Sequence, residues 1–403
     1  MTPFPFGNVA PHYRLTFLAM LPFYSALGCL GTNHVGTTAV NPRGASAQHV
    51  VQVPGTVVTS DEALSVDDLF SRGLHRFEQR RYSLAASDLE IAARSLAASG
   101  QIQLAWYRAA IARDESGDFK TAAEDFNRAI TCDELSALAR DARVRLIRLL
   151  VFLERWADAG EQARWMAHQY QYLHPVEAIV VKGAWALDAL SNNDWVAAAR
   201  EIEGARTIIE DKQFDVATRL QRDVAIVYFA LGELRRLRAA ELRFVPLPPN
   251  FGEQLERRCQ LLLDAQSAYS MAMRAYDAHW SVISGYRVSQ LYEELHHDLM
   301  QVLPLVQLPD PEHRSLLEAA LRLRYTILLD KAASGLNRTL ALAVRTDENS
   351  KWVALAKQAL ENLRVAMADE QASLAEVPYT REELRRAIER LDESRRSLPS
   401  KKK

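Results

Sequence analysis

The chain has 403 residues, of which 48% are hydrophobic and 25% charged, and its formal net charge is −2. This is the composition of an ordinary globular protein, with neither the basic excess that favours nucleic acid nor the acidic excess of a disordered tail. Three cysteines, at positions 29, 132 and 259, are too few and too widely spaced for a disulfide framework or a zinc site.

Residues 1–29 are predicted to form a signal peptide. The positive charge of Arg14 precedes an apolar run, Leu15–Leu27, which Pro22 interrupts and which is too short to span a bilayer comfortably. The next segment, Ala26-Leu27-Gly28-Cys29, resembles the lipobox of bacterial lipoproteins, although Ala26 and Leu27 are exchanged relative to the usual order. The resemblance implies that Cys29 is lipidated and becomes the mature N-terminus. An ordinary cleaved signal, an uncleaved anchor and a mis-assigned start are the alternatives.

The residue after the cysteine is Leu30 rather than Asp. By resemblance to lipoprotein sorting signals, this implies a cell-envelope lipoprotein of the outer membrane that faces the periplasm. A secreted or periplasmic protein is the alternative. Residues 30–60 are rich in Gly, Thr, Asn, Ser, Pro and Val without a helical period, and they are predicted to be a flexible tether.

Residues 61–244 contain a repeated pattern of helical hairpins. Around the break at Gly117-Asp118, apolar residues recur every three or four positions on each side, which predicts two helices. The small residues Ala110 and Ala122 would let these helices approach closely. An aromatic residue followed three positions later by Ala recurs at intervals of 37, 37 and 39 residues, in the pairs Tyr82/Ala85, Phe119/Ala122, Trp156/Ala159 and Trp195/Ala198.

This pattern resembles the tetratricopeptide repeat, because Trp106 is followed by small residues and then by Ala122-x3-Phe126. The resemblance, to bacterial outer-membrane lipoproteins with such repeats, implies an all-α, right-handed solenoid of antiparallel hairpins. The interval exceeds the roughly 34 residues of the family. We therefore expect extended turns between hairpins, such as the turn at residues 98–100.

A fifth hairpin is expected to begin near Phe214 and to be followed by a proline-rich break at residues 245–252. Residues 253–376 are predicted to be a divergent helical-repeat domain, similar to a region of envelope lipoproteins of gliding bacteria. Its shared residues are Trp280, Tyr286, Leu291–Glu293 and Leu329–Ala332. Residues 377–403 are predicted to form a charged helix, opened by a Thr380/Glu383 capping box, and a basic tail.

No group of residues has the spacing of a catalytic, metal or cofactor site. His296 and His297 adjoin two glutamates, but neighbouring residues on a helix point about 100° apart and do not readily share an ion. Cys132 and Cys259 are expected to be unpaired thiols, with a disulfide as the alternative. Neither a phosphate-binding glycine loop nor a nucleophile elbow occurs.

The resemblance implies a partner-binding groove along the first helix of each hairpin. Carried over by position, this groove comprises Phe70, Leu74, Phe77, Leu104, Tyr107, Ile111, Asp114, Val144, Arg148 and Phe152. The alternative is that several of these residues are core between repeats. Phe70 and Leu74 stand where chaperone-binding repeats have Asn or Lys, so we do not expect that role.

Together these features predict a non-catalytic scaffold for other envelope proteins, held at the membrane by a lipid anchor. Its setting would be a motility, secretion or envelope-assembly complex, with neither nucleic acid nor a small-molecule substrate as ligand. The first alternative is an enzyme, or enzyme accessory, with a site in the second half; the residues to inspect there are His279, His296, His297 and His313. The second alternative is a cytoplasmic adaptor built from the same repeats.

Overall fold

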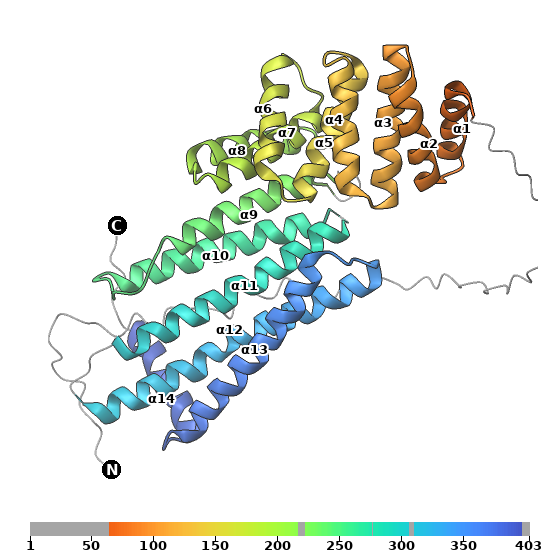
Figure 1. Ribbon diagram of the computed structural model, residues 1–403. Helices are drawn as coiled ribbons and strands as arrows, with labels where there is room; N and C mark the ends of the chain where they lie inside the picture. Colours follow the sequence, from red (N-terminus) through yellow and green to blue (C-terminus); the bar gives the residue numbers. More distant parts are fainter. Residues whose placement is uncertain (1–63, 217–221, 276, 306–309, 397–403) are drawn as a thin grey trace, which may run out of the picture. The chain divides into compact units, whose positions relative to one another are not determined.

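The computed structural model describes residues 64–216, 222–275, 277–305 and 310–396. Within these ranges the chain forms fourteen α-helices and a short 3-10 turn, with no strand, so the all-α prediction is confirmed (Figure 1). The predicted signal peptide, Cys29 and the tether lie outside the described residues. None of the helices in the described ranges is both long and apolar enough to cross a membrane.

The described residues divide into two compact units, at residues 64–138 and 139–396. The first unit contains α1 (Val66–Glu78), α2 (Tyr82–Ser95), α3 (Ser99–Ser116) and α4 (Phe119–Cys132). Consecutive helices pack against each other along this unit. The unit boundary falls within the first turn of α5 (Ala137–Phe152).

The second unit begins with short helices and continues with long ones. The short ones after α5 are α6 (Trp156–Gln169), α7 (Pro175–Ser191), α8 (Trp195–Asp211) and α9 (Val224–Ala240). The long helices α10 (Phe251–Met273), α11 (Ala278–Val302), α12 (Pro311–Thr346) and α13 (Lys351–Glu376) lie side by side (Figure 1). The last helix, α14 (Arg381–Arg396), packs on α12, and the 3-10 turn is at Leu303–Leu305.

The alanine of each predicted marker pair is at a helix contact. Ala85, Ala122, Ala159 and Ala198 are each 0% exposed. Because an Ala side chain is small, the two helices of a hairpin approach closely at this position, as the sequence pattern predicted.

Each of the first four hairpins turns through a residue in the left-handed backbone conformation. This residue stands two positions before the aromatic marker and ends the first helix. Only one of the four is a glycine, the residue that adopts this conformation without a Cβ penalty. The four are Arg80, Gly117, Glu154 and Asn193, with φ of 59°, 85°, 58° and 58°.

Two expectations about boundaries are corrected. The predicted extended turn at residues 98–100 is wrong, because α3 begins at Ser99. The extra residues of the long repeat interval belong to this helix, which has 18 residues. The helix expected from near Phe214 begins at Val224, and it packs against α10. The proline-rich segment therefore connects two helices of one hairpin.

The predicted capping box of the last helix is confirmed. The Glu383 carboxylate accepts a hydrogen bond from the Thr380 backbone N–H at 2.8 Å, and the Thr380 hydroxyl accepts one from the Glu383 N–H at 3.3 Å. Leu384 then packs on Ala319 and Ala320 of α12. The cap fixes where α14 begins, and Leu384 holds this helix against α12.

Candidate interaction surfaces

In the first unit, the predicted groove residues divide into a half-buried group and a buried group. Tyr107 and Ile111 are only 7% and 8% exposed, and the Tyr107 ring lies edge-on to Phe126 with centroids 6.2 Å apart. These two residues belong to the core of the α3–α4 hairpin. The remaining five are half-buried: Phe70, Leu74, Phe77, Leu104 and Asp114.

Four of the half-buried residues form an apolar face with an arginine on it. Phe70, Leu74 and Phe77 follow one side of α1, and the Arg108 guanidinium of α3 lies over the Phe77 ring, 5.1 Å from its centroid. Leu104 lies one turn before Arg108 on α3. No carboxylate of the described residues pairs with Arg108. We call these five residues the α1–α3 surface.

The other sides of α1 are firmly held. A Cβ on Gly73 would lie 2.7 Å from Leu89 Cγ, so α1 and α2 touch at this glycine. Arg72 and Arg76 both donate hydrogen bonds to the buried Asp88 carboxylate, at 2.7 to 2.9 Å for Arg72 and 2.6 Å for Arg76. The α1–α3 surface is therefore carried by a rigid support, which lowers the entropic cost of binding.

A polar position inside the hairpins also repeats, and sequence reasoning missed it. In the second helix of each hairpin, an acidic or amide side chain accepts a hydrogen bond from an Arg or Lys side chain of the first helix. The interval is again 37, 37 and 39 residues. The acceptors are Asp88, Asp125, Gln162 and Glu201, and the cations are Arg76, Arg113, Arg143 and Lys182.

The predicted groove residues of α5 contact other parts of the same unit. Arg148 donates two hydrogen bonds of 2.8 Å to Asp223, and the Phe152 ring stacks on His279 with centroids 4.2 Å apart. Val144 is buried. Near the end of the same helix, Glu154 accepts a 2.8 Å hydrogen bond from the Trp352 indole. This face of α5 is thus covered by the chain itself.

The histidines of the second half do not converge. His279 and His296 are both buried in α11, but they are 17 residues apart, roughly 25 Å along a helix. His297 and His313 are exposed, which confirms that His296 and His297 point apart. Among the described residues, no group of three or more His, Cys, Asp or Glu is placed to hold a metal ion.

The two buried histidines have unpartnered ring nitrogens. Among the described residues, neither nitrogen of His279 has a hydrogen-bond partner, and its Nδ1 lies 4.0 Å from Glu348. His296 Nε2 also lacks a hydrogen-bond partner and lies 3.9 Å from Glu370. Burial lowers the pKa of His279, and burial together with the nearby Arg322 lowers the pKa of His296 to about 4. Both rings are therefore neutral at pH 7.

The two thiols in the described residues are free. Cys132 is half-buried in α4 and donates a hydrogen bond to the Arg128 carbonyl. Cys259 is buried in α10, where desolvation raises the pKa of its thiol to about 12. A thiol that stays protonated is a poor nucleophile, so Cys259 acts as a core residue.

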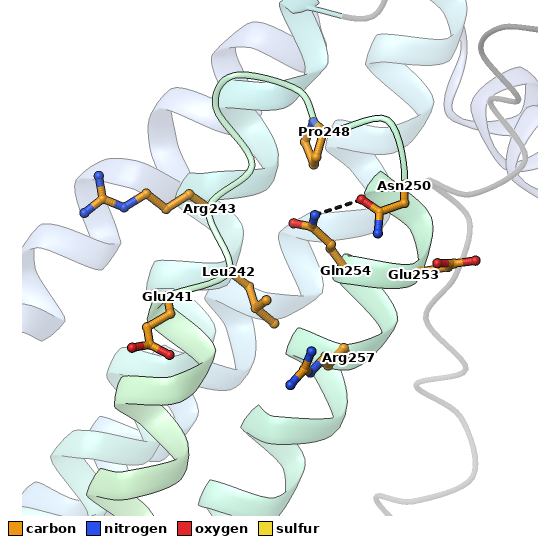
Figure 2. Close-up of a pocket in the computed structure, with 8 residues that line it drawn as sticks. All are labelled: Glu241, Leu242, Arg243, Pro248, Asn250, Glu253, Gln254 and Arg257. Carbon is orange, nitrogen blue, oxygen red and sulfur yellow. Dashed lines mark hydrogen bonds between the residues drawn. The ribbon is translucent and has the colours of Figure 1, made fainter. Parts of the chain in front are cut away.

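An open pocket of about 510 Å³ lies beside the loop between α9 and α10 (Figure 2). Gln254 donates a 2.8 Å hydrogen bond to Asn250 on one side of it, next to Pro248. The charged residues around it are two glutamates and two arginines: Glu241, Glu253, Arg243 and Arg257. Because both signs are present equally, this pocket favours no class of charged ligand.

A second pocket, of about 330 Å³, is lined by aromatic side chains. Tyr170 and Tyr172 come from the loop between α6 and α7, and Trp185 comes from α7. Ala178 and Val181 lie on the same side of α7 as Trp185. We call this the aromatic pocket; it is completed by Ala167, Gln171, Leu173, Lys182 and Glu201.

Arg140 of α5 fixes the loop that carries the two tyrosines. Its guanidinium lies 4.4 Å from the Tyr170 ring centroid, donates to the Tyr172 carbonyl at 3.1 Å and pairs with Glu177 at 2.5 Å. Burial opposes ionisation of Glu177, but Arg140 and the His174 backbone N–H outweigh it and lower the pKa of this carboxyl. The ion pair, and with it the loop, persists at neutral pH.

The chain matches no family model, and no curated protein matches it. At the α1–α3 surface and in the aromatic pocket, partly exposed apolar side chains adjoin polar groups that lack a hydrogen-bond partner among the described residues. Unpaired groups beside exposed apolar area are features of binding surfaces.

Proposed function

We propose that this protein is a non-catalytic scaffold that binds segments of other proteins. We further propose that its hairpins form a right-handed solenoid of the tetratricopeptide type. The support for the solenoid is the shared interval of three features: the buried alanine, the left-handed turn residue and the hydrogen-bonded polar position of the second helix. Repeats of this kind stack hairpins and present extended binding surfaces.

The observation that carries the proposal is the α1–α3 surface. Phe70, Leu74, Phe77 and Leu104 leave part of their apolar area in water, and Arg108 has no carboxylate partner among the described residues. An amphipathic segment with apolar anchors and one Asp or Glu would cover the apolar area and pair the guanidinium. The partner segment we propose is therefore acidic and amphipathic.

The site of action that we propose is the bacterial cell envelope. The support is the sequence at Ala26-Leu27-Gly28-Cys29, where lipidation of Cys29 would anchor the chain at the outer membrane, facing the periplasm. Two or more acyl chains are needed for stable anchoring. The partners would then be other envelope proteins.

A crosslinking pull-down of the tagged full chain tests the binding surface. The test variant combines Leu74→Ala with Arg108→Glu. The matched control, Leu84→Ala with Lys120→Glu, makes the same leucine truncation and the same reversal of a basic side chain's charge at exposed positions on α2 and α4. We expect the test variant alone to lose partners, because anchor residues contribute about 1–3 kcal/mol each.

The assignment fails if both variants capture the same partners in the yield of the unchanged protein. Thermal melting of each variant shows whether the fold is kept. The buried Tyr107 and Ile111 are unsuitable for this test, since their truncation would also leave a cavity in the α3–α4 hairpin.

A further inference from the structure

We propose that the aromatic pocket is a second docking site, which takes a proline-rich segment of a partner protein in the polyproline II conformation. This site lies on α6, α7, α8 and their connections, and its residues are separate from those of the α1–α3 surface. The scaffold would thus have two specificities, one for an acidic amphipathic segment and one for a proline-rich segment.

The first argument is the shape and composition of the walls. Tyr172 is 80% exposed, and Tyr170 and Trp185 are half-buried, so each presents part of its ring to the pocket. Proline-rich segments bind in grooves lined by aromatic rings, against which the pyrrolidine rings pack. Arg140 holds the Tyr170 ring and the Tyr172 backbone carbonyl, so this part of the wall is formed before a ligand arrives.

The second argument is that the charges around the pocket are already neutralised. Glu201, whose side chain is only 6% exposed, pairs with Lys182 at 3.0 Å and with Arg200 at 2.9 Å. A Cβ at position 204 would lie 3.1 Å from Lys182 Nζ, so the glycine leaves room for this side chain. With Glu177 held by Arg140, no unpaired charge among the pocket residues selects a charged ligand.

The third argument is the balance of hydrogen-bonding groups. The carboxylate of Glu201 and the carbonyl of Tyr172 already accept bonds from cations. The indole N–H of Trp185 has no hydrogen-bond partner among the described residues. These two acceptors are therefore occupied, whereas the Trp185 N–H is a donor left for a ligand.

Proline-rich chains complement this balance. Proline has a carbonyl acceptor but no backbone N–H, so such a chain accepts hydrogen bonds and brings few donors that need a partner. The polyproline II helix also exists before binding, which reduces the entropy lost on docking. A helical segment would hide its carbonyls within its own hydrogen bonds and would leave the Trp185 N–H unsatisfied.

The test measures binding of a capped oligoproline peptide to the full chain by calorimetry and by tryptophan fluorescence. A capped Gly-Ser peptide of equal length is the control ligand. We expect the oligoproline to bind and the Gly-Ser peptide to bind at least about tenfold more weakly, since it lacks both the rings and the preformed helix. Equal binding of the two peptides, or no binding of the oligoproline, overturns the proposal.

Three variants locate the binding. Tyr172→Ala removes the most exposed ring, and Trp185→Phe keeps a ring but removes the N–H donor; each is expected to weaken oligoproline binding by about tenfold. The control is Val196→Ala, which truncates a residue that is 79% exposed on α8 and does not line the pocket. Unchanged binding to Tyr172→Ala, or equal losses in all three variants, contradicts the assignment.

The same experiment separates this proposal from the first one. The Leu74→Ala, Arg108→Glu variant should bind oligoproline as the unchanged protein does. If it loses that binding while Tyr172→Ala retains it, the peptide occupies the α1–α3 surface and the aromatic pocket is not the site. Concentration-dependent dimerisation that Tyr172→Ala abolishes would identify a second copy as the occupant and would also overturn the proposal.

Discussion

Gly117 and Gly100 show at the scale of single residues how backbone conformation decides the effect of a methyl group. A Cβ at either position would meet no atom within 4 Å. Gly117 has φ of 85°, whereas Gly100 lies in the first turn of α3. Gly117→Ala should therefore lower the free energy of unfolding by about 1–2 kcal/mol.

Gly100→Ala should instead raise it by up to about 1 kcal/mol, because alanine loses less conformational entropy than glycine in a helix. Urea unfolding of both variants checks the two signs. If both variants shift in the same direction, the difference in backbone conformation at these positions is not what governs their stability.

His296 gives the second residue-scale prediction, which concerns pH. Its folded pKa of about 4 lies below its ordinary value of 6.5, so the unfolded chain binds the proton first as pH falls. The stabilisation is present above about pH 6.5 and is lost towards pH 4, and it amounts to roughly 1–3 kcal/mol. The free energy of unfolding, followed by urea titration across this window, should fall accordingly.

His296→Gln should flatten that pH dependence, and His297→Gln is its matched control at the neighbouring exposed position. A slope that persists equally in both variants would show that His296 is not responsible for the loss.

At this scale, the sequence indicated apolar positions better than polar ones. Ala85 and Ala122 were found because helical periodicity is local, and each is buried. The pairing of Arg113 with Asp125, and the lack of a carboxylate partner for Arg108 among the described residues, depend on which side chains the fold brings together. The 37-residue interval from Asp88 to Asp125 was the available signal, and it was overlooked because both residues are polar.

At the scale of elements, the contact between α3 and α4 explains why an alanine is needed at position 122. Ala122 is 0% exposed, so Ala122→Leu would place three more carbons into a filled contact. We expect the free energy of unfolding to fall by about 1–3 kcal/mol. Asn127→Leu, at an exposed position of the same helix, is the control and should change it by less than about 0.5 kcal/mol. Equal stability of the two variants would contradict close packing at Ala122.

Element boundaries were predictable where a cap defines them and less so elsewhere. Thr380 with Glu383 placed the start of the last helix correctly, because a cap acts through bonds between near neighbours. The start of α3 at Ser99 has no side-chain cap, and the sequence was wrongly interpreted as a turn at this position. The aromatic pocket was missed because its walls come from a loop and two helices, which no periodic pattern joins.

At the scale of the whole molecule, the proposed anchoring and the proposed partner binding can be tested by separate variants. Cys29→Ser should release the protein from membranes on fractionation and abolish labelling by a fatty-acid analogue, because the acceptor thiol is gone. Labelling that persists in this variant rules out Cys29 as the acylated residue. Partner binding at the α1–α3 surface should be retained in detergent extracts of the same variant.

The α5 residues show that a groove assigned by resemblance does not reveal which of its side chains contact the rest of the chain. Arg148 and Phe152 were assigned to the groove by resemblance alone, but they contact Asp223 and His279 of the same unit. The sequence contains no local sign of this pairing, since Asp223 is 75 residues from Arg148. The part of the predicted groove open to a partner is therefore the α1–α3 surface.

Site-specific photocrosslinking tests the central claim most directly. A photoreactive phenylalanine analogue is placed at Leu74, on the α1–α3 surface, or at the neighbouring, exposed His75 as a matched control. We expect discrete adducts with another protein from position 74 that disappear when Arg108→Glu is added, and few from position 75. Equal adducts from both positions, or adducts that persist with Arg108→Glu, would contradict a scaffold that binds its partner through this surface.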